Sequence, residues 1–519
     1  MSPRPRLCLL AAAIGIALSR LAIAQPVGNE FRINTYTTSN QTQPRVSVSA
    51  TGAFAVVWHS QNQNSAVDGV FAQRFDSSGG ALGNEFQVSS TLASSDFSPA
   101  LSLGSSSFVV VWYVTSPTSG VFARRFAATG APLGPDFRVN TYTTSTQFPA
   151  VATQPDGAFV VVWQTTFGPG NAGVFGQRYA SSGDPLGGEF RISRMTTSLQ
   201  SYPAVTSDGS GGFIVAWQGV APDNLGLDIF ARRYASDGSP SAVEFRVNND
   251  TSSTQHVASI AAAPNGDFVI AWQSYQRDGS SEGVFARHFA STGAPLGLDF
   301  QVNATTSSAQ HDPYVASDGA GFVVVWQSEG QDGSGGGVFA QRYDSAGSPL
   351  GVEFRLNSYT TLDQALPSVA KKPNGDFVVV WQSQGQDGSS YGIFGQGFCA
   401  ALSSVTVSVM GSTTVCTMAT GGVATVTDVG GTTTTHQWGY RSSPGSPFPA
   451  MISGETGTTY TIDGADFPGA GTYYVICVTF PACGSFLISN EITVTVTADS
   501  MAPVVTAPAA ATTTQTLCQ

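Results

Sequence analysis

The stretch Asp376–Trp381, which reads DFVVVW, decides the fold, because its apolar strand ending in tryptophan recurs along the chain. The other copies read FAVVW, FVVVW, FIVAW or FVIAW. The tryptophans that end these strands lie 51 to 55 residues apart: Trp58, Trp112, Trp163, Trp217, Trp272, Trp326 and Trp381. A fixed period of this length is typical of repeat architectures. The sequence therefore predicts seven structural units.

Each unit reads as four short strands with turns between them. A strand of the type GVFAQRF follows the tryptophan strand, a strand of the type EFRVN comes next, and a Thr-rich loop leads to a short P-x-V strand. Asp-Gly and Asn-Gly turns then return the chain to the tryptophan strand, as expected for hairpins. Four antiparallel strands in roughly 50 residues match one blade of a β-propeller.

The two ends of the array complement each other. Strands of the EFRVN type begin at Glu30, Glu85, Asp136, Glu189, Glu244, Asp299 and Glu353. The first of them precedes the first tryptophan hairpin, whereas none follows the last hairpin, which ends at Phe398. We therefore predict an all-β fold, a seven-bladed propeller in which residues 30–34 pair with residues 392–398 so that no sheet edge stays open.

A different β pattern begins near Ser403. Alternating strands such as SVTVSV and EITVTVT predict a β-sandwich, with Trp438 as the plug between its sheets and Tyr473 as a tyrosine corner. This part resembles bacterial immunoglobulin-like domains. Residues 28–498 together resemble bacterial secreted or surface proteins that join such repeat arrays to immunoglobulin-like modules, a resemblance that implies no particular activity. The predicted organisation is a signal peptide (1–24), the propeller (25–402), the sandwich (403–498) and an Ala/Pro/Thr-rich linker or tail (499–519).

The amino terminus has the three-part layout of a secretory signal, with two arginines, an apolar run over 7–18 and small residues up to Ala24. We expect cleavage before Gln25, with a second possible site after Ser19. The mature protein is expected to be secreted, either free or associated with the cell surface. No later stretch is apolar enough for a membrane helix, and we expect a monomer.

The charge balance excludes some partners. The formal net charge is -12 and the only lysines are Lys371 and Lys372, so no broad basic surface exists to neutralise a nucleic-acid backbone. We expect a glycan or a protein surface as the partner, no nucleic acid and no cofactor.

Export permits disulfides, and four cysteines lie close together in the sequence: Cys399, Cys416, Cys477 and Cys483. The resemblance to immunoglobulin-like domains suggests a bond between Cys416 and Cys477. The alternative pairs Cys477 with Cys483 across a hairpin and leaves Cys399 for Cys416. Cys518 leaves the count in the mature chain odd.

Glutamines before the innermost strands are the first candidates for ligand contact. They are Gln41, Gln147, Gln200, Gln255, Gln310 and Gln364, with Asp96 at the same position of the second unit. One hypothesis is that they ring the opening of the propeller and bind a sugar, a peptide end or an ion. The alternative, which we favour, is that each amide satisfies nearby backbone groups.

Charges that recur in every unit are expected to be structural. We predict cross-strand pairs between Arg74, Arg125, Arg178, Arg233, His288 and Arg342 and the carboxylates that open the next strands. Asp96, Asp223 and Asp312 break the repeat pattern. Three Asp-Gly-Ser turns, at Asp278, Asp332 and Asp387, could suggest calcium, but they lack the alternating oxygens of a calcium loop and match ordinary hairpin turns. No metal site and no catalytic residue is predicted.

These observations favour an extracellular binding or adhesion protein. Its variable loops, which carry Tyr202, Tyr275, Tyr314 and Tyr391, would face a glycan or protein ligand. The alternatives are a secreted polysaccharide hydrolase or lyase, which needs carboxylates of particular blades to converge, and a purely structural surface protein.

Overall fold

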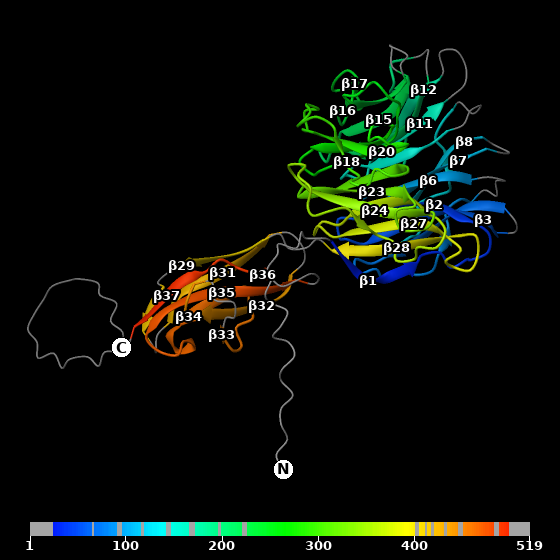
Figure 1. The fold of residues 1–519 in the computed structure, drawn as a ribbon. Helices are drawn as coiled ribbons and strands as arrows, with labels where there is room; N and C mark the ends of the chain where they lie inside the picture. Colours follow the sequence, from blue (N-terminus) through cyan, green and yellow to red (C-terminus); the bar gives the residue numbers. More distant parts are fainter. Residues whose placement is uncertain are drawn as a thin grey trace, which may run out of the picture. The chain divides into compact units, whose positions relative to one another are not determined.

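The computed structural model describes residues 24–64, 67–90, 96–115, 119–141, 147–165, 172–195, 199–220, 226–399, 404–410, 413–416, 420–429, 433–444, 450–481 and 487–497. Within these ranges the chain is all-β apart from one short 3-10 helix, η1 (Gly464–Asp466). Seven four-stranded antiparallel sheets come first, and two further sheets follow (Figure 1). The predicted fold class is confirmed.

Six blades each consist of four consecutive strands, from the innermost to the outermost. Blade 1 holds β2 (Gln41–Val48), β3 (Phe54–Asn64), β4 (Val67–Phe75) and β5 (Phe86–Gln87), and blade 2 holds β6 (Asp96–Leu103), β7 (Ser107–Val114), β8 (Gly120–Ala127) and β9 (Phe137–Arg138). Blade 3 holds β10 (Ala150–Thr153), β11 (Phe159–Thr165), β12 (Gly173–Tyr179) and β13 (Phe190–Arg191), and blade 4 holds β14 (Gln200–Ser207), β15 (Phe213–Val220), β16 (Leu227–Tyr234) and β17 (Phe245–Arg246). Blade 5 holds β18 (Gln255–Ala262), β19 (Phe268–Tyr275), β20 (Glu282–Phe289) and β21 (Phe300–Gln301), and blade 6 holds β22 (Gln310–Ser317), β23 (Gly321–Glu329), β24 (Gly336–Asp344) and β25 (Phe354–Arg355).

Blade 7 joins the two ends of the array. It holds β26 (Gln364–Lys371), β27 (Phe377–Gln384), β28 (Tyr391–Cys399) and, as its outer strand, β1 (Gln25–Arg32), which lies beside β28 in Figure 1. The Ile33 amide donates to the Ile393 carbonyl at 2.8 Å, and the Ile393 amide donates to Asn34 Oδ1 at 2.7 Å. The predicted closure is therefore confirmed.

The core lies between the blades. The seven repeat tryptophans are buried, with at most 2% of each exposed, and Trp112, for example, packs against Val57 and Val70 of blade 1. Each blade also has a stacked pair of aromatic rings on its second and third strands, such as Phe54 with Phe75 at 4.7 Å between centroids. Because these contacts recur in every unit, they explain the repeat but not any function.

The recurrent carboxylates connect blades, although Asp299 also pairs within blade 5, with Arg277 at 3.0 Å. Glu85 of blade 1 accepts hydrogen bonds from the amide and hydroxyl of Thr35 at 2.6 and 2.9 Å, and Glu30 accepts two bonds of 2.6 Å from Ser358. The same role recurs at Asp136, Glu189, Glu244, Asp299 and Glu353. We predicted that each carboxylate pairs with the arginine or histidine on the neighbouring strand of its own blade. That prediction is wrong, because each carboxylate accepts a backbone N–H from a loop of the preceding blade.

The recurrent arginines also bond to a neighbouring blade. Arg178 donates to the carbonyls of Ser236, at 2.6 Å, and Asp237 in the turn of blade 4, and Arg233 donates to the Thr292 carbonyl at 2.8 Å. Arg74 and Arg125 reach the turns of the following blades in the same way. Hydrogen bonds from these charged donors to turn carbonyls connect neighbouring blades, so the recurrent arginines are structural.

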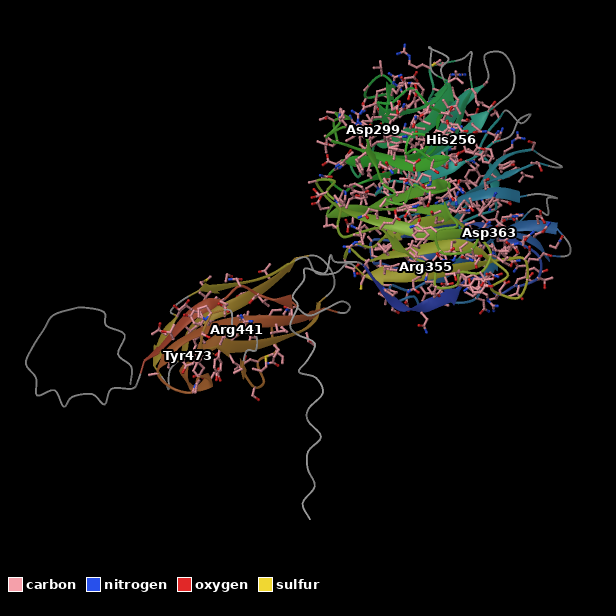
Figure 2. The ribbon with its side chains drawn as sticks, in the orientation of Figure 1. His256, Asp299, Arg355, Asp363, Arg441 and Tyr473 are labelled. Carbon is pink, nitrogen blue, oxygen red and sulfur yellow. The ribbon has the colours of Figure 1, made fainter. Side chains whose placement is uncertain are left out.

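The C-terminal strands form two sheets. The three-stranded sheet orders β29 (Ser404–Met410), β31 (Thr420–Val429) and β34 (Thr459–Asp463), and the second orders β30 (Thr414–Cys416), β37 (Ile492–Thr497), β35 (Gly471–Pro481), β32 (Thr433–Arg441) and β33 (Ala450–Met451), with β36 (Leu487–Ile488) paired to β35. Trp438 is fully buried in their common core, and the Tyr473 hydroxyl donates to the Gly469 carbonyl at 3.0 Å (labelled in Figure 2). The predicted sandwich with its tyrosine corner is confirmed.

The chain divides into two compact units, of which the first contains Glu30–Lys371 and Val378–Gln396. Cys399 is disulfide-bonded. Cys477 is buried in the sandwich, with its sulfur 3.9 Å from the Val478 carbonyl oxygen. Both predicted pairings of Cys477, with Cys416 or with Cys483, are wrong, because Cys477 keeps its thiol. The pairing of Cys399 with Cys416 stays a prediction, since the side chain of Cys416 and the whole of Cys483 lie outside the described residues. Residues 1–23 and 498–519 also lie outside them, and among the described residues no helix is long and apolar enough to cross a membrane.

Candidate functional site

The innermost strands of the seven blades form a closed circle, in which each strand is adjacent to two others: β2, β6, β10, β14, β18, β22 and β26. In six of the seven blades, one residue near the start of the innermost strand has a left-handed backbone conformation. These residues are Gln43, Ser98, Tyr202, Val257, Asp312 and Leu366. The φ angles of these residues lie between 48° and 57°, and bulges interrupt the pairing with the tryptophan strand at this point. We call these residues, together with the residues that follow the tryptophans, the axial rim.

A circle of amides holds most of the axial rim together. The glutamine after the tryptophan accepts the amide N–H of the bulge residue in the next blade, as between Gln218 and Val257 at 2.8 Å and between Gln273 and Asp312 at 2.9 Å. Gln164, Gln327 and Gln382 do the same. Blade 1 has His59 after its tryptophan, and there Gln43 supplies the acceptor for Ser98 at 2.8 Å.

The circle changes between blades 2 and 4. Blade 2 has Tyr113 in place of the glutamine, and blade 3 has one residue fewer between Gln147 and Ala150 than blade 4 has between Gln200 and Ala204. Three aromatic rings fill this part of the rim: Phe148 lies 5.8 Å from Tyr113 and is stacked on Tyr202 at 4.8 Å. Tyr202 is 42% exposed, while burial, with a smaller contribution from Tyr202, raises the pKa of Tyr113. We call Tyr113, Phe148 and Tyr202 the aromatic ladder.

Blades 5 and 6 place charged groups on the same rim. His256 (labelled in Figure 2) lies 3.1 Å from Glu282, and His311 lies between Asp312 at 2.9 Å and Glu329 at 3.0 Å. Burial opposes the charge on the His311 ring, but the hydrogen bonds and charges of the two carboxylates outweigh it and raise the pKa of His311 to about 9. The hydrogen bond from His256 lowers the pKa of Glu282. We call these five residues the charged cluster; its three carboxylates outnumber its two histidines, so its net charge at neutral pH is negative.

The six glutamines predicted as ligand contacts lie inside the blades. Each is at most 2% exposed, and their amides are already bonded: Gln200 and Gln255 accept from Trp217 and Trp272 at 2.8 Å, and Gln310 and Gln364 accept from neighbouring asparagines. Gln41 and Gln147 accept from asparagines in the same way. The idea that they line an opening is therefore corrected, because a fully buried amide offers no atom to a ligand.

Of the aspartates that break the repeat, Asp312 belongs to the charged cluster, with 32% of its side chain exposed. The side chain of Asp96 and all of Asp223 lie outside the described residues. Asp278 and Asp332 each accept from an asparagine amide at 3.0 Å, so both act as turn caps. No group of three or more ligating side chains that could hold a metal ion occurs in the described ranges.

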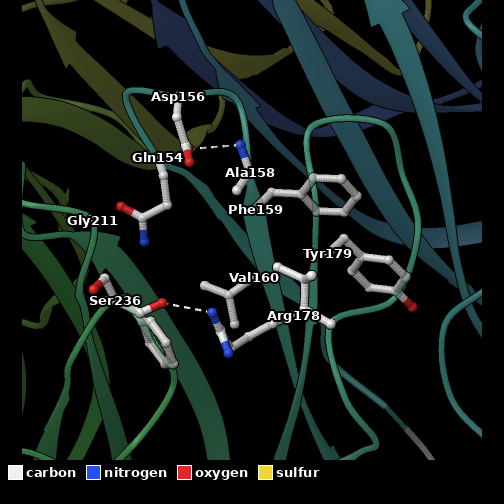
Figure 3. A pocket seen from close by; sticks show the side chains of 11 residues that line it. Gln154, Asp156, Ala158, Phe159, Val160, Arg178, Tyr179, Gly211 and Ser236 are labelled. Carbon is white, nitrogen blue, oxygen red and sulfur yellow. Dashed lines mark hydrogen bonds between the residues drawn. The ribbon is translucent and has the colours of Figure 1, made fainter.

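Loops of adjacent blades meet at the same end of the strands as the axial rim. Ser280 in the loop of blade 5 donates to the Ser308 carbonyl at 2.5 Å, and Ser389 in the loop of blade 7 donates to the Ser39 carbonyl at 3.3 Å. A small cavity of about 110 Å³ lies at the other end of the strands, between blades 3 and 4 and beside Arg178 and Ser236 (Figure 3). Ligand pockets usually measure about 300 Å³ or more, so we place the candidate site at the axial rim.

Sequence comparison gives no family, because neither a protein-family model nor a curated protein matches the chain. Similar solved structures include a protein of unknown function from Dyadobacter fermentans, at 12% identity and a TM-score of 0.44 over 72% of this chain and 98% of that one. A fungal alcohol oxidase of the AA5 family is 11% identical, with a TM-score of 0.45 over 92% and 100% of the two chains. An ulvan lyase of the PL25 family is 10% identical, with a TM-score of 0.41 over 72% and 94%. Such likeness concerns the fold alone.

Proposed function

We propose that this protein is an extracellular glycan-binding protein and that the axial rim is its binding face. The observation that carries the proposal is the aromatic ladder. Aromatic faces stack on the apolar C–H faces of sugar rings, and tyrosine adds a hydroxyl that can bond to the ligand. Tyr202, the outermost ring of the ladder, is 42% exposed although it stacks on Phe148, so a flat surface remains accessible.

The position of the ladder supports a functional role over a structural one. Five of the seven blades close the rim with a buried glutamine, which shows that stability needs no aromatic residue there. The junction between blades 2 and 3 departs from this solution, because blade 2 has Tyr113 in place of the glutamine and blade 3 has a shorter inner strand. Next to the ladder, partly exposed carboxylates of blades 5 and 6 can accept hydrogen bonds from sugar hydroxyls.

A glycan array probed with the purified chain tests the proposal and selects a ligand for calorimetry. Replacing Tyr202 by Ala should weaken binding about fivefold or more, since an aromatic contact contributes about 1 kcal/mol or more. Tyr275→Ala is the matched control, because Tyr275 is similarly exposed at 45% but lies on blade 5, outside the ladder. Equal affinities of the two variants, or no glycan bound at all, would refute the proposal.

Polysaccharide cleavage is the second candidate function, and the charged cluster favours it. Glu282, Asp312 and Glu329 come from two blades and converge, which is the condition that carboxylate catalysis requires. The candidate is weaker because both nitrogens of His311 already bond to carboxylates. Release of reducing or unsaturated ends from a polysaccharide panel, abolished by Asp312→Asn and Glu282→Gln, would establish it.

A further inference from the structure

Arg45 occupies a position on the inner strand of blade 1 where other blades have small residues. The residue paired with the position before the tryptophan is Ala100, Ala150, Ala204 and Ser259 in blades 2 to 5, and Tyr314 in blade 6. The repeat therefore needs no long side chain here. Arg45 and Tyr314 are the two exceptions among these blades, and they contact each other.

The contact between them crosses the inside of the circle. The Arg45 guanidinium lies over the Tyr314 ring, 4.9 Å from its centroid, although the strands that carry them, β2 and β22, are separated by β26. A side chain that joins two strands across a third has to run on the axial side of that third strand. Arg45 lies two residues after the bulge at Gln43, and Tyr314 lies two residues after Asp312, so the pair lies just beneath the axial rim.

Most N–H groups of the Arg45 guanidinium have no hydrogen-bond acceptor among the described residues. In the described part of the chain its one hydrogen bond runs from Nη1 to the Pro44 carbonyl at 2.8 Å, and no carboxylate pairs with it. Stacking on Tyr314 engages the face of the guanidinium and leaves its edge, which carries the N–H fork, for other partners. The carboxylates of the nearby charged cluster are each bonded to histidine or glutamine instead.

We propose that Arg45 binds an anionic substituent, a carboxylate or a sulfate, of the glycan held by the axial rim. The N–H fork of arginine matches the two oxygens of such a group, and the stacked tyrosine fixes the orientation of the fork. The proposal rests on the proposed glycan-binding function and adds the ligand class, an acidic polysaccharide. Sugar rings would lie on the aromatic ladder while the acid group reaches down to Arg45.

Two polymer pairs test this inference and distinguish the two anions. Polygalacturonate is compared with its fully methyl-esterified form, and dextran sulfate with dextran, by affinity electrophoresis of the full chain. At least one anionic polymer should bind at least tenfold more tightly than its neutral partner, and Arg45→Met should remove that difference. Arg45→Lys, which keeps the charge without the fork, should retain part of it.

Arg355→Met is the matched control, because it removes the same charge from an exposed position on the outer strand β25 (Figure 2). Equal losses in Arg45→Met and Arg355→Met would show a general charge effect and overturn the inference. Equal binding of anionic and neutral polymers would overturn it as well. If neutral glycans bind and Tyr202→Ala weakens them while Arg45→Met changes nothing, only the ligand class is wrong; if no polymer and no array glycan binds, the proposed function itself fails.

Discussion

Asn34 provides a sharp test of how the ring closes. It lies just after β1, is 1% exposed, and accepts the amide N–H of Ile393 in β28 at 2.7 Å. Its amide group donates to the Tyr36 carbonyl at 2.7 Å and to Gln41 Oε1 at 3.2 Å. Asn34→Ala thus removes three hydrogen bonds and leaves a buried N–H of the last blade without its acceptor.

The expected cost is about 2–4 kcal/mol in the free energy of unfolding, because an unsatisfied buried N–H alone costs about 1–3 kcal/mol. Asn303 offers a matched control in the interior of the array. It accepts from Val284 at 2.8 Å and donates to Thr305 and Gln310 at 2.8 and 3.0 Å, the same three contacts between two consecutive strands. It also donates to Asp278 at 3.0 Å.

Urea unfolding of the two alanine variants, with the midpoint and the slope both fitted, measures the two costs. If β1 completes blade 7, both variants lower the midpoint, and Asn303→Ala lowers it somewhat more because it also removes the bond to Asp278. A loss in Asn303→Ala together with no loss in Asn34→Ala would show that the amino-terminal strand is not part of the ring.

Two further predictions concern other sites. The folded pKa of His311, about 9, lies above the ordinary value of 6.5, so its stabilising contribution is complete below pH 6.5 and is lost as pH rises through 9. The urea midpoint of the wild type should therefore fall more steeply between pH 7 and 9.5 than that of His311→Gln, and parallel pH profiles would contradict the pairing with Asp312 and Glu329. Tyr473→Phe removes the hydrogen bond to the Gly469 carbonyl and should cost the sandwich about 1 kcal/mol in thermal unfolding, whereas Tyr474→Phe should cost clearly less. Equal effects of these two substitutions would argue against the tyrosine corner.

Ring closure was predictable because it depends on counting strands. The EFRVN-type strand at Glu30 has no hairpin before it, and the hairpin that ends at Phe398 has no such strand after it. Pairing these two ends completes a seventh blade like the other six. The tyrosine corner was predictable for a similar reason, since a local Gly-Thr-Tyr pattern specifies it. Both features depend on the order of residues along the chain and not on the direction of a side chain.

The axial rim was harder to predict because the direction of its side chains decides its chemistry. Gln255 and Gln273 are both conspicuous in the sequence of blade 5, yet the first turns inward to Trp272 while the second reaches the next blade. The recurrent Trp-Gln dipeptide was an available signal for the amide circle. The aromatic ladder also left a signal, because Gln147 is one residue closer to its following proline than Gln200 is. Arg45 and Tyr314 meet only through the geometry of the circle.

Hydrogen–deuterium exchange of the full chain, with and without the glycan selected on the array, tests the binding face most directly. We predict slower exchange at residues 147–150 and 199–204, which carry Phe148 and Tyr202, together with the start of β2 around Arg45. Protection confined to the turns at the opposite end of the strands, such as residues 76–80 and 235–239, or to the sandwich strands, would contradict the placement of the site at the axial rim.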